Sequence, residues 1–113
     1  MKTTIQLKND RYRKVRGGTT RVLQITCVGT PNHPCGQLLC IYQKDGPGIL
    51  RRLYLDRIIE NTLVERKAGS SVFIMCPKCK RDVGLYYPYK KEDNRPAYRL
   101  FADAVKKSVV KKT

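Results

Sequence analysis

The chain has 113 residues, with 24 Lys and Arg against 9 Asp and Glu, so its formal net charge at pH 7 is +15. A chain of this length forms one domain, and because only 8% of its residues are aromatic and none is Trp, its core is modest. So large an excess of positive charge predicts an anionic partner. The sequence has no apolar run of about 18 residues and no lipidation signal, so we expect no membrane partner.

The first 21 residues are predicted to form a flexible basic arm. A single acid, Asp10, lies among its cations, and Gly17-Gly18-Thr19-Thr20 is too flexible to favour a helix. Arginine can bind phosphate oxygens through two parallel hydrogen bonds, and lysine adds a compact charge. We therefore expect nucleic-acid contacts from Arg11, Arg13, Lys14, Arg16 and Arg21. The alternative is a disordered tail that only improves solubility.

Two pairs of cysteines follow strand-like segments. Cys27 comes after residues 22–26 and is separated by seven residues from Cys35, whereas Cys76-Pro77-Lys78-Cys79 follows the apolar run 72–75. The second pair has the spacing of a zinc knuckle, in which a strand supplies one thiolate and a tight turn returns the other. We predict one structural zinc ion, worth on the order of 10 kcal/mol of folding free energy, bound by four ligands. These ligands are Cys27, Cys35, Cys76 and Cys79.

Other roles for the cysteines and for the single histidine agree less well with the sequence than a site of four cysteines does. The start of the chain has no secretory signal, which predicts a cytoplasmic location, and five cysteines leave one without a disulfide partner. Cys40 lies in the apolar run 38–42, so we expect it in the core. A site of three cysteines with His33 in place of Cys27 is the main alternative, because His33 lies in the loop between the first two cysteines.

A long β-hairpin is predicted after the first cysteine pair. Residues 38–44 and 49–55 are strand-like and flank Asp45-Gly46-Pro47-Gly48, whose glycines suit a tight turn. The tip would carry Lys44, with Arg51 and Arg52 at the start of the returning strand. Three cations at one end of a rigid ribbon would suit insertion between phosphate groups. The alternative is an ordinary solvated face.

The second cysteine pair is surrounded by Lys78, Lys80 and Arg81, and a strand is expected at residues 83–87. A site of four thiolates around zinc is formally dianionic, so these cations can either offset that charge or bind phosphate.

The C-terminal segment is predicted to be an amphipathic helix. After Pro96, apolar residues recur at steps of three and four up to residue 109, which corresponds to about four turns. Its polar face would carry Lys106 and Lys107. The expected fold is thus a small β-rich α+β domain with a zinc-ribbon-like antiparallel sheet. It is divided into a basic arm (1–21), a zinc-binding β domain (22–95) and a helix with a basic tail (96–113).

The two cysteine pairs, with strands leading into and away from each, resemble the zinc-ribbon superfamily over roughly residues 22–87. The first pair is more widely spaced than usual, and the residues between the pairs would make a larger sheet, similar to the zinc-binding β-tent domains. The resemblance implies a structural zinc ion on a β-scaffold and no activity. With one histidine, no Gly-rich phosphate loop and no Ser-His-Asp or paired-carboxylate pattern, we expect that the protein is not an enzyme.

These features predict a zinc-stabilised RNA-binding protein, ribosomal or ribosome-associated, that contacts rRNA phosphates and ribosomal proteins and is not a free homo-oligomer. The alternative is a zinc-ribbon accessory protein of transcription or replication that binds DNA or a polymerase. The sequence does not separate the two, because phosphate contacts supply affinity without identifying the nucleic acid.

Overall fold

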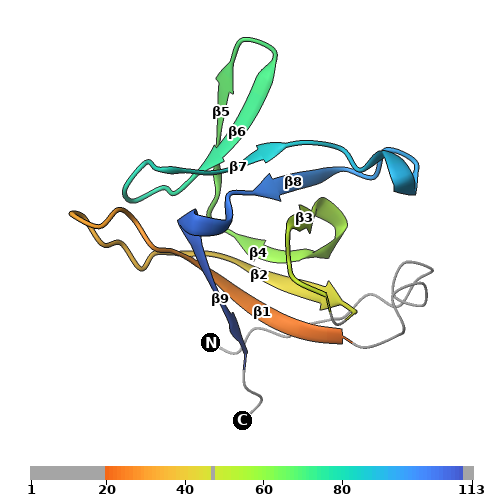
Figure 1. The fold of residues 1–113 in the computed structure, drawn as a ribbon, viewed down its shortest axis with the longest axis horizontal. Helices are drawn as coiled ribbons and strands as arrows, with labels where there is room; N and C mark the ends of the chain where they lie inside the picture. The colour runs from red at the N-terminus through yellow and green to blue at the C-terminus, as the bar shows by residue number, and fades with distance from the viewer. Residues whose placement is uncertain (1–19, 47, 111–113) are drawn as a thin grey trace.

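In the computed structural model, which describes residues 20–46 and 48–110, nine strands form two antiparallel sheets (Figure 1). The four-stranded sheet has the order β4-β2-β1-β9 and consists of β1 (Thr20–Cys27), β2 (Leu38–Asp45), β4 (Ile58–Asn61) and β9 (Val105–Val109). The five-stranded sheet has the order β3-β8-β7-β6-β5 and consists of β3 (Arg52–Tyr54), β5 (Val64–Ala68), β6 (Ser71–Met75), β7 (Asp82–Tyr86) and β8 (Ala97–Leu100). Single-turn 3-10 helices η1 (Leu55–Arg57), η2 (Lys90–Glu92) and η3 (Ala102–Ala104) lie in three of the connections.

Both sheets contribute to one apolar core. In β1 the buried residues Leu23, Ile25 and Cys27 alternate with more exposed neighbours, which is the period of a strand with one face in the core. Leu53 and Ile74 join them from the five-stranded sheet. The chain passes between the sheets after β2, β3, β4 and β8, so the two sheets form one folding unit.

The predicted long β-hairpin of residues 38–44 and 49–55 is wrong. β2 pairs with β1 and β4, whereas β3 pairs with β8 in the other sheet. Gly46 does adopt the positive φ of a turn, 85°. After the turn the chain crosses to the second sheet, where the N–H of Tyr54 donates to the hydroxyl oxygen of Tyr42 (2.9 Å). Turn residues predict that the chain reverses, but they do not decide which sheet the next strand joins.

The predicted C-terminal helix is also wrong, because the described residues contain no α-helix and 96–110 instead form β8, η3 and β9. β8 pairs with β3 and β7, and β9 pairs with β1. The apolar residues that matched a helical period occur in two short runs separated by η3, and short apolar runs do not distinguish helix from strand. Tyr98 and Val105, of types that favour strands, are buried in β8 and β9. The described fold is therefore β-rich without an α-helical layer, and 96–110 belong to the sheets.

Of the predicted basic arm, residues 1–19 lie outside the described residues, and Thr20 and Arg21 begin β1. The strands expected at 22–26, 72–75 and 83–87 are confirmed as the main parts of β1, β6 and β7. Within the described ranges, no helix has the length and apolar character needed to cross a membrane.

Candidate metal centre and basic surface

The first cysteine pair lies at the base of a narrow extension of the β1–β2 hairpin. The N–H of Cys27 donates to the carbonyl of Gln37 (2.8 Å), and the N–H of Gly36 donates back to the carbonyl of Cys27 (2.7 Å). Residues 30–33 close the tip of this extension. Because the extra residues form the tip, a spacing of seven residues still brings Cys27 and Cys35 together.

Gly29 is required by the same loop. Its N–H donates to the sulfur of Cys27 (3.3 Å), and its φ is 71°. A Cβ at this position would collide with the carbonyl of His33, so only glycine fits without rearrangement. The role of Gly29 was not predicted from the sequence, although its position two residues after Cys27 is the available signal.

The second cysteine pair lies in the turn between β6 and β7. The N–H of Lys78 donates to the sulfur of Cys76 (3.4 Å), at the same offset of two residues as in the first pair. The N–H of Lys80 donates to the carbonyl of Cys76 (3.0 Å), and Lys80 itself has a left-handed φ of 65°. Amide N–H groups directed at sulfur favour the thiolate, which is the form that binds metals.

The four sulfurs of the two pairs lie within 4.8 Å of one another and form no disulfide. The sulfur of Cys27 is 3.5 Å from that of Cys79, and the sulfur of Cys35 is 3.7 Å from that of Cys76. A tetrahedral site with Zn–S bonds of about 2.3 Å requires sulfurs about 3.8 Å apart, so the cluster fits a metal ion. Figure 1 shows the two loops side by side at the left of the view. The cluster therefore joins the four-stranded sheet to the five-stranded sheet.

The thiols of Cys27, Cys76 and Cys79 differ in burial and in the direction of their pKa shifts. Burial raises the pKa of Cys27 to about 12 and also raises the pKa of Cys76. Partial burial acts to raise the pKa of Cys79 as well, but the N–H of Arg81 and the neighbouring thiols lower it overall. A cation bound among the sulfurs would favour the thiolate form of all four.

Neither Cys40 nor His33 belongs to the cluster. Cys40 is buried in β2, where burial raises its pKa to about 12, so the prediction that it is a core residue is confirmed. His33 is exposed at the tip of the first loop. Among the described residues, the candidate metal ligands are therefore the four cysteines and not three cysteines with His33.

Of the cations near the second pair, Arg81 has a structural role. Its guanidinium donates to the carbonyl of Gly29 and forms an ion pair with Asp103 (3.6 Å), which ties the two cysteine loops together. Lys78 and Lys80 are exposed, and no ion pair of either occurs among the described residues. They remain available to an anionic partner.

The other predicted nucleic-acid contacts do not gather at a hairpin tip. Lys44 is buried and donates to the carbonyl of Gly46 (2.7 Å), and Lys107 donates to the carbonyl of Leu50 (3.1 Å). Arg52 is partly buried, whereas Arg21, Arg51 and Lys106 are exposed. Arg11, Arg13, Lys14 and Arg16 lie outside the described residues.

Two buried arginines were not identified from the sequence. The side chains of Arg57 and Arg95 are 1% and 4% exposed, and each forms an ion pair. The bonded carboxylates of Asp45 and Asp56 lie 12 and 39 residues away along the chain, so no local pattern signals these pairs.

Comparison with known proteins gives no match: no family model, curated protein or solved structure is significantly similar to the chain.

Proposed function

We propose that the protein is a zinc-stabilised RNA-binding protein of the ribosomal or ribosome-associated class. The observation that carries the proposal is the four-cysteine cluster that joins the two sheets of a chain with net charge +15. A site made only of sulfur favours zinc over magnesium or calcium, which prefer oxygen ligands. Four protein ligands also fill a tetrahedral site, so the metal's role is structural.

The choice of RNA is supported by the surface. Among the described residues, Arg21, Arg51, Lys78, Lys80 and Lys106 are exposed cations. Tyr86 and Tyr87, which are 37% and 51% exposed, offer aromatic rings on which unpaired bases can stack. Exposed aromatic rings on a strongly basic chain suit single-stranded or irregular RNA better than regular duplex DNA.

The zinc assignment is tested by metal analysis of protein purified without added metal. We expect about one zinc ion per chain, lost in Cys79→Ser and retained in Cys40→Ser. Cys40→Ser is the matched control, because it removes a thiol from the core and not from the cluster. Full zinc content in Cys79→Ser would contradict the assignment.

RNA binding is tested by measuring affinity for ribosomal RNA fragments as a function of salt. If phosphate contacts dominate, the logarithm of affinity should fall linearly with the logarithm of salt concentration. Deleting residues 1–18, which contain six Lys or Arg and one acid, should flatten this slope by several units if most of these cations touch phosphate. Co-sedimentation of the native protein with ribosomal subunits after moderate salt washing supports the ribosomal class. Association with a polymerase, or equal affinity for duplex DNA, would contradict it.

A further inference from the structure

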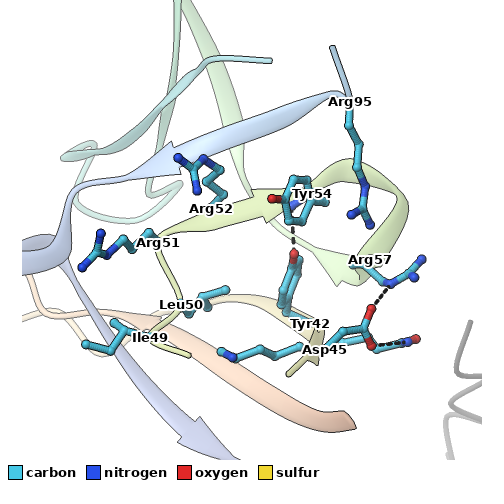
Figure 2. Close-up of a pocket in the computed structure, with 11 residues that line it drawn as sticks. Tyr42, Asp45, Ile49, Leu50, Arg51, Arg52, Tyr54, Arg57 and Arg95 are labelled. Carbon is cyan, nitrogen blue, oxygen red and sulfur yellow. Dashed lines mark hydrogen bonds and ion pairs between the residues drawn. The ribbon is translucent and has the colours of Figure 1, made fainter. Parts of the chain in front are cut away.

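A polar pocket of about 110 Å³ lies at the end of β2 where the two sheets meet (Figure 2). Its walls come from β2, from residues 49–52 and from the segments that carry Tyr54, Arg57 and Arg95. Five cations line it, and Asp45 is the single acid in its lining. The cations are Lys44, Arg51, Arg52, Arg57 and Arg95.

One wall of the pocket is held rigidly by buried ion pairs. The Nε of Arg57 lies 2.8 Å from a carboxylate oxygen of Asp45, and these side chains are 1% and 4% exposed. The other carboxylate oxygen of Asp45 accepts hydrogen bonds from Thr20 (3.1 Å) and Gln43 (3.0 Å). The Asp45 carboxylate is therefore already surrounded by donors, so little of its negative charge is offered to the pocket.

Arg95, which lies two residues before β8, fixes the same wall. Its guanidinium bonds to Asp56 (2.8 Å) and Glu92 (3.3 Å). The guanidinium carbon also lies 3.8 Å from the ring centroid of Tyr54. Arg57, whose guanidinium also lies 3.7 Å from the carboxylate of Asp56, and Arg95 are thus held by carboxylates in positions that do not depend on a ligand, and these carboxylates compensate their charge.

Arg51 and Arg52 form the other wall and differ from the buried pair. Figure 2 shows them on one side of Tyr42 and Tyr54, with Arg57 and Arg95 on the other. Neither forms an ion pair among the described residues. The guanidinium carbon of Arg52 lies 4.1 Å from the ring centroid of Tyr89. Stacking occupies the face of a guanidinium and leaves its in-plane N–H groups able to donate to a ligand.

We propose that this pocket binds a single phosphoryl group, with Arg51 and Arg52 as the direct donors and the ion-paired Arg57 and Arg95 as a rigid opposite wall. A phosphate monoester carries a charge of about −1.5 to −2 at pH 7 and three acceptor oxygens. Such a group matches the charges of two neighbouring arginines that form no ion pair among the described residues better than a carboxylate, which carries one charge. Arginine also forms paired hydrogen bonds to phosphate oxygens. The proposal does not rest on the proposed RNA binding, because it concerns one phosphoryl group and not a nucleic-acid backbone.

Calorimetric titration of the full-length zinc-loaded protein with inorganic phosphate, at constant ionic strength, tests the proposal. We expect saturable binding that weakens about tenfold or more in Arg51→Ala/Arg52→Ala. The charge-matched control is Lys67→Ala/Lys91→Ala, because both lysines are exposed and lie outside the pocket lining. This control should bind phosphate within about twofold of the wild type. Arg51→Ala alone keeps the test valid if the double variant does not fold, since Arg51 is exposed. Non-saturable binding, or equal weakening in pocket and control variants, would overturn the proposal.

The source of the phosphoryl group is resolved by a second titration. A short RNA with a 5′-phosphate is compared with the same RNA bearing a 5′-hydroxyl. Tighter binding of the phosphorylated RNA, lost in Arg51→Ala/Arg52→Ala, identifies an RNA end as the ligand. Equal binding of the two RNAs, together with saturable binding of inorganic phosphate, supports a small-molecule phosphate site. Because phosphate is titrated without RNA, failure of the pocket proposal and failure of RNA binding give different results.

Discussion

The four-cysteine cluster and the basic pocket lie at opposite ends of the β1–β2 pair, and they join the two sheets by different means. At one end Cys27 and Cys35 of the four-stranded sheet meet the cysteines of the β6–β7 turn. At the other end, where Thr20 pairs with Asp45, contact between the sheets runs through buried arginines and a tyrosine hydroxyl. Metal coordination needs only four ligand atoms in place, whereas the pocket depends on several ion pairs that must form together.

This difference predicts that the metal centre dominates stability. If the cluster holds zinc as proposed, removing the ion with a strong chelator should unfold the chain at both ends, because a structural zinc ion contributes on the order of 10 kcal/mol and small domains have a net stability of about 5–15 kcal/mol. Circular dichroism and amide hydrogen exchange measure the outcome, and added zinc should restore the fold. Persisting protection of β2 and β3 in the chelated protein would show that the pocket end is stable without metal.

The second prediction concerns the pocket end. Asp45→Ala should destabilise the protein by about 3 kcal/mol, because the buried guanidinium of Arg57 would keep only the more distant carboxylate of Asp56 (3.7 Å). Zinc content should stay at that of the wild type. Asp82→Ala is the control, since the ion pair of Asp82 with Arg66 is solvent-exposed and its loss should cost much less. Equal effects of the two substitutions in denaturant unfolding would show that the buried pair does not hold this end together.

The two ends also differ in how much the sequence reveals. Cysteine pairs are visible because their spacing reflects the geometry of the metal, and the structure brings all four predicted ligands together. The pocket is assembled from Asp45, Arg57 and Arg95, whose contacts span large separations along the chain. An arginine has the same appearance in sequence whether it is solvated or buried against a carboxylate. Only the tertiary fold decides which.

The errors in the predicted fold have the same origin. Short local patterns identified several strands correctly, but they did not assign strands to sheets. Gly46 has the positive φ expected of a turn, yet the strand after it pairs with β8 and not with β2. The spacing of the apolar residues in 97–109 matches a helical period. The structure instead pairs β8 and β9 with neighbouring strands. Long-range pairing overrides a local period of this length.

A third prediction tests whether the loop of the first cysteine pair tolerates a side chain at its glycines. Gly29→Ala should destabilise the zinc-bound protein by about 2–3 kcal/mol, because alanine pays for a positive φ and its Cβ would also meet the carbonyl of His33. Gly36→Ala is matched in conformation, with a φ of 92°, but a Cβ there meets nothing within 4 Å. It should cost only about 1 kcal/mol. Thermal unfolding of both variants with zinc bound gives the comparison, and equal losses would show that loop crowding is unimportant.

The smallest expected effect comes from Cys40, the cysteine that neither end uses. Burial raises its pKa from 9.0 to about 12, so the folded state keeps the thiol protonated while the unfolded chain ionises first as pH rises. Its contribution to stability is therefore complete below pH 9 and is lost as pH rises toward 12. Cys40→Val removes the ionisable group and keeps an apolar side chain in β2. The unfolding free energy of this variant relative to the wild type should improve by about 1 kcal/mol between pH 8 and pH 10. An unchanged difference between these pH values would mean that Cys40 ionises as readily in the fold as in the unfolded chain, which is incompatible with its place in the core.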